Sequence, residues 1–494
     1  MNDLTIDIFL SDHWLAISTI ATAMLMISVA YSISHALRNV RTSQATVAWT
    51  VALISLPIIT LPLYWVLARN KFEGYREAIR EVSSRQHHSE STVQNELHTA
   101  SFTRSTTLNS AIEQVADVMD TPLSRADAFE LLIDGAAFFE CMYAEIAKAS
   151  DYVYIEFFIL RDDDVGNKLA QCLIDRAHAG VRVRVLYDEV GCLRLSNSYL
   201  SRLSQAGVEV LPFNTRQGWV NRFQINFRNH RKLVVIDGKT AIVGGLNVGS
   251  EYLGSSGKSG RWRDTGLKVT GPITNKIQAV FASDYYWAAR KNLPEARWRI
   301  ADNKSPDNLS ETGKDFNAVC CATGPADLRP RASMMFSAAA QAAKSKLWIC
   351  TPYLVPDEAS IVALHMAKAR GVDVRLLIPD KADHLLVYLA GFHYVNEFTE
   401  AQIPVYRYHD GFMHQKCVLI DDQLALIGST NLDNRSLHLN FEMMIGISDQ
   451  DFIQTVDKML TEDFEQASQQ DGRKVRWWYE RVGTAVARLS SPIL

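Results

Sequence analysis

The sequence predicts an α/β fold of two duplicated lobes, each with a mixed, largely parallel sheet flanked by helices, behind an N-terminal two-helix transmembrane hairpin. Three observations predict it. Two long uncharged runs open the chain, a strand–helix–strand pattern then occurs twice, and a polar motif follows each copy. At 494 residues the chain is also too long for one ordinary globular core, so we expect several domains.

The composition excludes several classes of protein. Hydrophobic residues make up 47% of the chain and charged residues 21%, which fits neither disorder nor a wholly membrane-embedded protein. The net charge of −4 gives no global basic field, so no nucleic acid partner is expected. The seven cysteines are scattered without a Cys-x-x-Cys pair, so free thiols are expected rather than disulfides or a zinc site.

Two uncharged runs near the N-terminus predict membrane-spanning helices. Residues 14–34 and 42–68 carry no charge, and each run is long enough to cross a hydrocarbon core of about 30 Å. A signal peptide is a poor alternative, because acidic residues precede the first run and no Lys or Arg comes before Arg38. A pair of buried soluble helices is the other alternative. The predicted helices and their hairpin are about 14–35 and 45–67 within residues 1–70.

The distribution of basic residues predicts the orientation in the membrane. Residues 69–85 contain five Lys or Arg, whereas the short loop between the runs holds only Arg38 and Arg41. The positive-inside rule therefore places the bulk of the chain on the cytoplasmic side. Residues 71–107, which include a stretch rich in Ser, Thr, Gln and His, are expected to form a tether.

The rest of the chain shows an internal duplication. A strand, a helical segment, a glycine and a second strand occur over 154–186 and again over 347–377. Such βαβ units imply a largely parallel sheet covered by helices. The predicted parts are a first lobe at 108–295, a linker at 296–316, a second lobe at 317–470, and a basic, aromatic C-terminal helix and tail at 471–494.

Each copy is followed by the same polar motif, His-x-Lys-x4-Asp and then Gly-Gly/Ser-x-Asn. Two matches with the same downstream residues are not a plausible accident. His and Lys two apart on a strand share one face, and a glycine turn with an Asn donor suits an anion. The motif residues are His230, Lys232, Asp237, Gly245 and Asn247 in the first copy, and His414, Lys416, Asp421, Ser429 and Asn431 in the second.

Catalytic imidazoles also need a carboxylate to fix their tautomer. Asp264 and Glu442 follow the two motifs at comparable distances and are the candidates for this role. Asp237 and Asp421 are expected to fix the geometry of the site rather than transfer protons. No cluster of His, Cys, Asp or Glu has the spacing of a metal site, so no metal is expected.

These motifs resemble those of the phospholipase D superfamily over about residues 130–450. The resemblance implies that His230 and His414 face each other across one phosphate, where one forms a phosphohistidine and the other acts as acid and base. His230 would be the nucleophile, an assignment that the sequence alone does not fix. Lys232, Lys416 and the two Asn residues would hold the phosphate oxygens. The implied chemistry needs no cofactor.

Several longer sequence segments are similar to those of the two-span bacterial cardiolipin synthases. This resemblance implies transfer of a phosphatidyl group between two phosphatidylglycerols in the bacterial inner membrane. The products would be cardiolipin and glycerol. The alternative is a membrane-tethered phospholipase D or nuclease that uses water as acceptor. A homo-oligomer is left open. Gly266 departs from the His that the family often has. The sequence segments that carry this similarity are 226–232, 262–265, 351–353 and 434–442.

Overall fold

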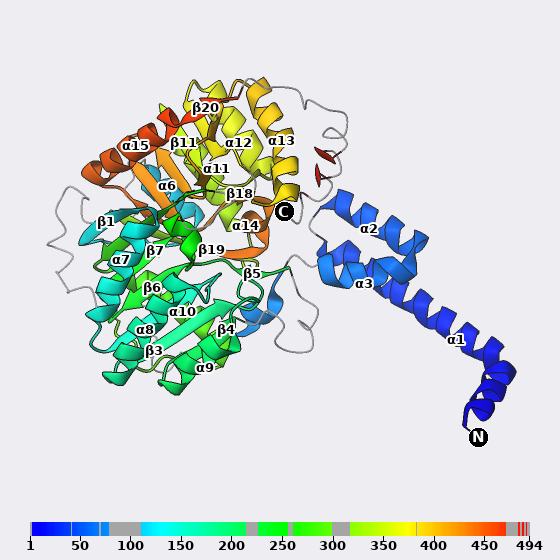
Figure 1. Ribbon diagram of the computed structural model, residues 1–494. Helices are drawn as coiled ribbons and strands as arrows, with labels where there is room; N and C mark the ends of the chain where they lie inside the picture. The colour runs from blue at the N-terminus through cyan, green and yellow to red at the C-terminus, as the bar shows by residue number, and fades with distance from the viewer. Residues whose placement is uncertain are drawn as a thin grey trace. The chain divides into compact units, whose positions relative to one another are not determined.

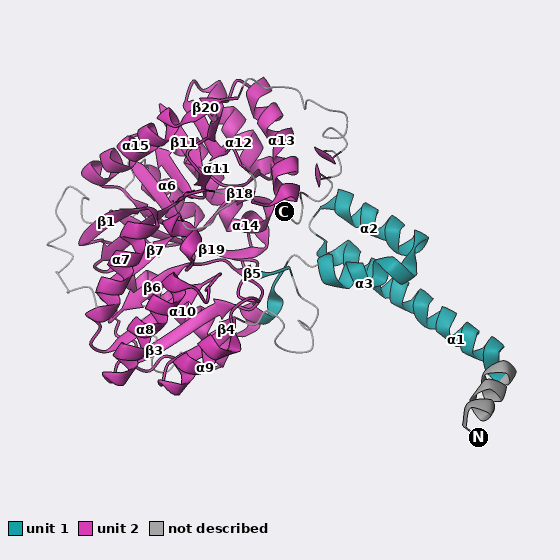
Figure 2. Ribbon diagram, in the orientation of Figure 1, with its two compact units in different colours: residues 1–74, 215–227 teal, residues 75–214, 228–494 magenta. Residues whose placement is uncertain are grey.

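The computed structural model forms two compact units, one of residues 1–74 and 215–227 and one of residues 75–214 and 228–494 (Figures 1 and 2). The predicted tether, linker and C-terminal helix lie mostly outside the described residues, and the predicted lobe boundaries stay predictions. The structure describes residues 2–40, 42–68, 71–78, 110–213, 226–254, 260–298, 317–381, 383–470, 483–484, 487–488 and 491.

The first unit contains a long apolar helix with two shorter helices folded back against it. Trp65 Nε1 donates a hydrogen bond of 3.0 Å to Ser32 Oγ, and the Tyr64 hydroxyl lies 2.7 Å from His35 Nδ1. These contacts hold the second uncharged run against the first. The three helices are α1 (Asn2–Asn39), α2 (Ser43–Ser55) and α3 (Pro57–Leu67).

The second predicted span, 45–67, is not one continuous helix. Proline has no backbone N–H and is favoured at the first turn of a helix, and here α2 ends at Ser55 and Pro57 begins α3, whereas Pro62 is accommodated inside α3. Among the described residues, one segment, His13–Asn39 in α1, is long and apolar enough to span a membrane by itself. A multi-pass anchor therefore needs α2 and α3 together.

The first half of the second unit is built on a seven-stranded sheet in the order β1-β9-β7-β6-β2-β3-β4 (Figure 1). The strands are β1 (Ala128–Ile133), β2 (Tyr152–Phe157), β3 (Arg182–Asp188), β4 (Glu209–Phe213), β6 (Leu233–Ile236), β7 (Thr240–Gly244) and β9 (Thr265–Thr270). Its helices are α7 (Asp134–Ala147), α8 (Asp164–His178), α9 (Asn197–Gln205) and α10 (Ile273–Ala289), with the short η1 (Ser250–Leu253).

The second half repeats this plan on a larger sheet in the order β10-β19-β17-β16-β11-β13-β14-β20. The strands are β10 (Ala318–Thr323), β11 (Lys346–Cys350), β13 (Asp373–Pro379), β14 (Val405–Tyr408), β16 (Cys417–Ile420), β17 (Leu424–Gly428), β19 (Asn440–Ile447) and β20 (Ala467–Gln469). Its helices are α11 (Arg331–Ala342), α12 (Glu358–Ala369), α13 (Leu385–Glu400), α14 (Asn434–His438) and α15 (Gln450–Glu465), with α6 (Ala111–Val118) from the start of the chain. The short strands β12 (Leu354–Val355) and β18 (Leu432–Asp433) pair beside it.

The two mixed α/β sheets confirm the predicted fold class, but the expectation that they are largely parallel is wrong. Parallel pairing joins β2 to β3 and β3 to β4 in the first sheet, whereas its other pairs are antiparallel. The second sheet repeats this, with parallel pairs at β11–β13 and β13–β14. The βαβ units predict only the β2–β3 and β11–β13 pairs, which lie toward one edge of each sheet. The motif strands β6 and β7 form an antiparallel hairpin, which needs no crossover helix.

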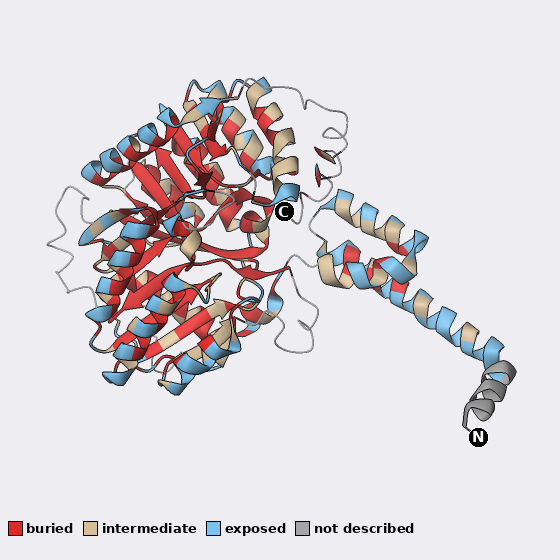
Figure 3. Ribbon diagram, in the orientation of Figure 1, coloured by how far each residue is buried: buried red, intermediate tan, exposed pale blue. Residues whose placement is uncertain are grey.

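A core shared by the two sheets lies in the middle of the second unit (Figure 3). Alternation along β2 explains how one strand serves two layers: Tyr152 and Tyr154 face the shared core, whereas Val153 and Ile155 face α7 and α8. Helices α10 and α15 contribute to the shared core, and α11 to α13 cover the outer face of the second sheet. The two halves are therefore packed face to face, which places their motifs in one unit.

Candidate active site

His230 lies where a strand of the first half pairs with a strand of the second. The short strand β5 (Arg228–Asn229) runs parallel to β19, and the His230 N–H donates to the carbonyl oxygen of Phe441 at 2.9 Å. This register places the imidazole beside the next residue of β19. His230 Nδ1 lies 3.0 Å from Glu442 Oε2.

His414 occupies the mirrored position. It follows β15 (Phe412–Met413), which runs parallel to β8 (Trp262–Arg263) of the first half, and its N–H donates to the Arg263 carbonyl at 2.7 Å. His414 Nδ1 then lies 2.6 Å from Asp264 Oδ2. Each imidazole therefore takes its carboxylate from the other half of the chain. Sequence separation alone gave no sign of this exchange.

The two motif lysines are buried with the histidines. Lys232 Nζ donates to the His230 carbonyl at 2.6 Å, and Lys416 Nζ donates to the His414 carbonyl. Lys416 Nζ also lies 2.9 Å from His414 Nδ1 and 3.9 Å from Asp264 Oδ2. Burial lowers the pKa of Lys416 to about 8, although Asp264 and Glu442 oppose this, and burial lowers that of Lys232 well below its usual value.

In the site without substrate, burial favours the neutral form of both imidazoles. Burial lowers the pKa of His230 to about 4, although the Glu442 carboxylate opposes this. Burial and the charge of Lys416 lower the pKa of His414 well below its usual value, and the charges of Lys232 and of His230 when it is protonated act in the same direction. The motif groups of both halves therefore interact electrostatically in one site. A carboxylate at Nδ1 favours the tautomer with its hydrogen there, which leaves Nε2 as a base.

The two carboxylates are held differently. Three donors bind Glu442: Ser429 Oγ at 2.6 Å, Ser436 Oγ at 2.8 Å and Asn440 Nδ2 at 3.1 Å. Burial raises the pKa of Glu442, but its hydrogen bonds and the nearby positive charges lower it overall. Asp264 accepts from the Thr265 N–H at 2.7 Å, and burial raises its pKa to about 6.

Gly245 and Ser429 occupy equivalent motif positions and shape these carboxylate sites. A Cβ atom at Gly245 would lie 2.2 Å from Asp264 Oδ1, so only glycine lets this carboxylate take its place. Ser429 instead donates its hydroxyl to Glu442. The expectation that both residues support phosphate directly stays a prediction, because their contacts in the structure are to the carboxylates.

The motif asparagines lie buried in the same region. Asn247 Oδ1 accepts from the Ile159 N–H at 3.1 Å, and Asn247 Nδ2 donates to the Tyr252 hydroxyl at 3.2 Å. Asn431 Nδ2 donates to Asp433 Oδ2 at 3.2 Å, while its buried Oδ1 has no hydrogen-bond partner among the described residues. The phosphate-binding role predicted for both side chains stays a prediction.

The motif aspartates lie at the far ends of their strands. Asp237 lies five positions after Lys232, which is about 16 Å along an extended strand. Asp237 accepts from the backbone N–H groups of Asp151 and Tyr152, both at 2.9 Å, and Asp421 binds the start of β11 in the same way. Both residues adopt positive φ, 53° and 49°. These contacts hold one strand end to the next, and the part of the aspartates in fixing the geometry of the site stays a prediction.

Two supporting residues escaped the sequence reasoning. The Tyr252 hydroxyl lies 3.4 Å from His414 Nδ1, and nothing in the sequence around η1 indicates this contact. The Arg231 guanidinium donates to the Asp284 carboxylate at 2.5 Å and to the Glu442 carbonyl at 3.2 Å, so it holds the strand that carries Glu442 in place. The sequence offered one sign of this role. Arg231 lies between His230 and Lys232, so its side chain must point to the opposite face of the strand.

Comparison with protein families gives one match that covers more than half of the chain. The family model described as "Cardiolipin synthase, PLD-like domain" matches residues 142–284 and 337–464. The two matched segments contain the two motifs, one in each half.

Curated relatives match over almost the whole length. The chain is 41% identical over 468 residues to cardiolipin synthase A of Pseudomonas putida (strain W619), which covers 93% of this chain and 95% of the relative. It is also 41% identical to cardiolipin synthase A of Pseudomonas aeruginosa (strain LESB58), with 93% of each chain covered. Among solved structures, a phosphatidylserine synthase from Haemophilus influenzae Rd KW20 matches with a TM-score of 0.60 at 18% identity, covering 78% of this chain and 100% of the other. The likeness at this identity concerns the fold.

Proposed function

The chain belongs to the cardiolipin synthases of the phospholipase D-like family, and from this premise we propose that it joins two phosphatidylglycerols at the site formed by His230 and His414. Membership makes the chain a phosphatidyltransferase of phospholipid biosynthesis. One observation supports placing the reaction at this site. Each imidazole contacts a carboxylate from the other half of the chain, His230 that of Glu442 and His414 that of Asp264.

In the first step, Nε2 of His230 attacks the phosphorus of the donor lipid. A phosphorus–nitrogen bond forms, the bond to the glycerol headgroup breaks, and the leaving alkoxide takes a proton. His414, the other imidazole of the site, carries that proton on Nε2 once the anionic phosphate is bound beside it, and this imidazolium is the general acid. The carboxylates at Nδ1 stabilise each imidazole when it becomes positively charged. The nucleophile is assigned to His230 by the family resemblance.

In the second step, the hydroxyl of another phosphatidylglycerol attacks the same phosphorus. His414 now acts as base and takes the hydroxyl proton, while the phosphorus–nitrogen bond breaks and frees His230. One phosphodiester replaces another, so no nucleotide is consumed. The products are cardiolipin and glycerol, and exclusion of water from the phosphohistidine keeps hydrolysis to phosphatidic acid slow.

Lys232 and Lys416 hold the non-bridging phosphate oxygens in this proposal, with Asn247 and Asn431 as further donors. A buried ammonium whose pKa is lowered gains most from an anion, because the anion restores the lost electrostatic stabilisation. The phosphate therefore raises the pKa of Lys416 when it binds.

The N-terminal unit is proposed to anchor the enzyme in the bacterial inner membrane. Helix α1 supplies one apolar segment of 27 residues, and α2 with α3 supplies a second, broken one. The larger number of basic residues after the second segment favours a cytoplasmic catalytic unit. Anchoring keeps the site near a lipid substrate that is concentrated in the bilayer.

Product analysis tests this function directly. Purified full-length protein is incubated with vesicles that contain phosphatidylglycerol labelled in one acyl chain and in the headgroup. We expect labelled cardiolipin and free glycerol in equal amounts, and their loss in His230→Ala and in His414→Ala with unchanged thermal denaturation. Phosphatidic acid as the main product would instead identify a phospholipase D, and near-normal turnover in either variant would exclude the two-histidine mechanism.

A further inference from the structure

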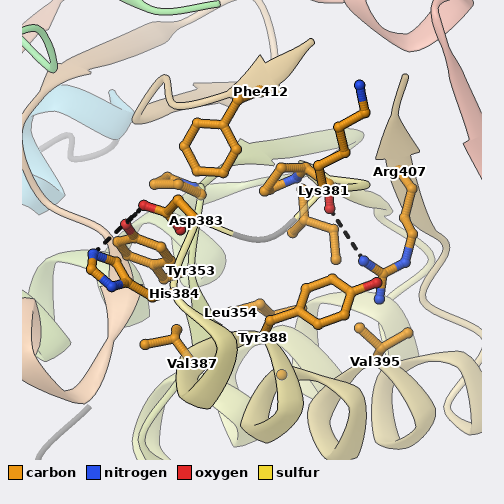
Figure 4. A pocket seen from close by; sticks show the side chains of 14 residues that line it. Tyr353, Leu354, Lys381, Asp383, His384, Val387, Tyr388, Val395, Arg407 and Phe412 are labelled. Carbon is orange, nitrogen blue, oxygen red and sulfur yellow. Dashed lines mark hydrogen bonds and ion pairs between the residues drawn. The ribbon is translucent and has the colours of Figure 1, made fainter. Parts of the chain in front are cut away.

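A pocket in the second half adjoins the active site. It lies between α13, the ends of β13 and β14, and β15, and has an empty volume of about 370 Å³, part of it open to solvent. Figure 4 shows Arg407 at one end beside Tyr388, and Asp383 with Tyr353 and His384 at the other. Apolar side chains such as Leu354, Val387 and Phe412 line the space between. The reaction steps above do not use this pocket.

Arg407 is a buried cation that makes no ion pair with a carboxylate of the described residues. The residue is 4% exposed, and the nearby Asp380, whose charge acts on Arg407, lies 3.6 Å from His409 instead. Its hydrogen bond is to the Pro379 carbonyl at 3.2 Å, and it packs over the rings of Tyr388 at 5.3 Å and Phe392 at 5.1 Å. Burial lowers the pKa of Arg407. A buried, unpaired charge is costly unless a ligand supplies the opposite charge.

The opposite end of the pocket faces the catalytic histidine. The Tyr353 hydroxyl donates to Asp383, and the negative charge of Asp383 acts on both His414 and Lys416. The ring of Phe412, in the pocket wall, lies 5.9 Å from the imidazole of His414. The pocket therefore offers a cation at one end and a hydrogen-bond acceptor near the general base at the other.

We propose that this pocket binds the headgroup of the acceptor phosphatidylglycerol, with its phosphate on Arg407 and its glycerol hydroxyls directed toward Asp383 and His414. This inference deepens the proposed function and rests on it. An acceptor lipid carries its own phosphodiester, which the two motif lysines cannot hold while they hold the transferred phosphate. Arg407 supplies a second anion site, and its planar guanidinium suits two phosphate oxygens at once.

Bound in this way, the acceptor places a hydroxyl beside His414. His414 takes its proton, the oxygen attacks the phosphorus on His230, and the phosphorus–nitrogen bond breaks. A water molecule or a free glycerol has no phosphate and gains nothing from Arg407. The pocket therefore favours transfer to a lipid over transfer to glycerol or water.

Comparison of two acceptors in the variant Arg407→Gln tests the proposal. Labelled free glycerol exchanges into phosphatidylglycerol through the same phosphohistidine but brings no acceptor phosphate, whereas cardiolipin synthesis requires it. We expect cardiolipin synthesis at low phosphatidylglycerol content to fall by about ten- to a hundredfold, the range of a charge-assisted hydrogen bond, while glycerol exchange stays within about twofold. The ratio of phosphatidic acid to cardiolipin should rise, and Arg407→Lys should retain part of the transfer activity.

The matched control is Arg375→Gln, which removes an arginine of β13 that instead pairs with Asp373 and packs on Trp348. Its two activities should keep the wild-type ratio. Equal losses of exchange and synthesis in Arg407→Gln, or no loss in either, would overturn the acceptor site. Failure of the proposed function is distinguishable, because the wild-type protein would then form no cardiolipin at all. Arg407→Met should denature at an unchanged or higher temperature, since it removes an unpaired charge; a marked fall in that temperature would contradict a ligand-binding role.

Discussion

Replacement of Gly245 by alanine is predicted to disable His414, which the new methyl group does not touch, by displacing Asp264. The added Cβ would lie 2.2 Å from Asp264 Oδ1 and 2.9 Å from Asp264 Cγ, where ordinary contact begins at 3.4 Å. The carboxylate must therefore retreat by about 1.2 Å. Backbone strain adds nothing, because Gly245 does not adopt a left-handed conformation.

The retreat breaks the contact that orients the imidazole. Asp264 Oδ2 now lies 2.6 Å from His414 Nδ1, and a shift of that size lengthens the distance to about 3.8 Å, beyond a hydrogen bond. Misplacement of a catalytic group by about 1 Å costs roughly a hundredfold in rate. We expect the kcat for cardiolipin formation from phosphatidylglycerol vesicles to fall by about that factor, with thermal denaturation measured alongside.

Ser429→Ala is the matched control at the equivalent position of the other half. It removes the hydrogen bond of 2.6 Å to Glu442, but Ser436 and Asn440 still hold that carboxylate. Its kcat should fall by less than about tenfold. A Gly245→Ala enzyme with a near-normal rate, or a Ser429→Ala enzyme that is equally impaired, would refute the assigned roles of the two carboxylate sites.

Three further predictions concern pH, metals and the membrane. The kcat/KM profile should be bell-shaped: it falls below about pH 6 as Asp264 is protonated and above about pH 8 as Lys416 loses its charge, and Lys416→Arg should move the basic limb upward. A flat profile between pH 5 and 9 would exclude these groups. Cardiolipin synthesis should continue in excess EDTA, since imidazole and ammonium groups perform the steps; inhibition reversed by added metal would require a metal site. Deletion of residues 1–70 should move the protein from the membrane pellet to the supernatant, and continued sedimentation with membranes would place the anchor elsewhere.

The duplicated motif let the sequence predict most of the catalytic set. His230 and His414 could be paired because each stands at the same place in a repeated unit, and the βαβ pattern predicted the parallel pairs β2–β3 and β11–β13. Asp264 and Glu442 were found as candidates by their similar distances from the motifs. The exchange of these carboxylates could not be predicted, because it depends on the pairing of β5 with β19 and β15 with β8 across the two halves.

Other features depend on packing that leaves no pattern along the chain. The hydroxyl of Tyr252 approaches His414 only because η1 folds beside β8, and only the fold buries Arg407 in a pocket wall. The break at Pro57 could be read from the sequence as a kink, yet whether α2 and α3 stay one span depends on how they pack against α1.

The number of phosphatidyl groups trapped per chain tests most directly whether the two halves share one phosphorus. Enzyme mixed with phosphatidylglycerol that carries ³²P is quenched within one turnover, and the labelled peptides are identified by mass spectrometry. A shared site predicts no more than one labelled group per chain, attached to His230 and absent from His230→Ala. Labelling that approaches two groups per chain, with both histidines modified together, would show two independent sites and contradict the account.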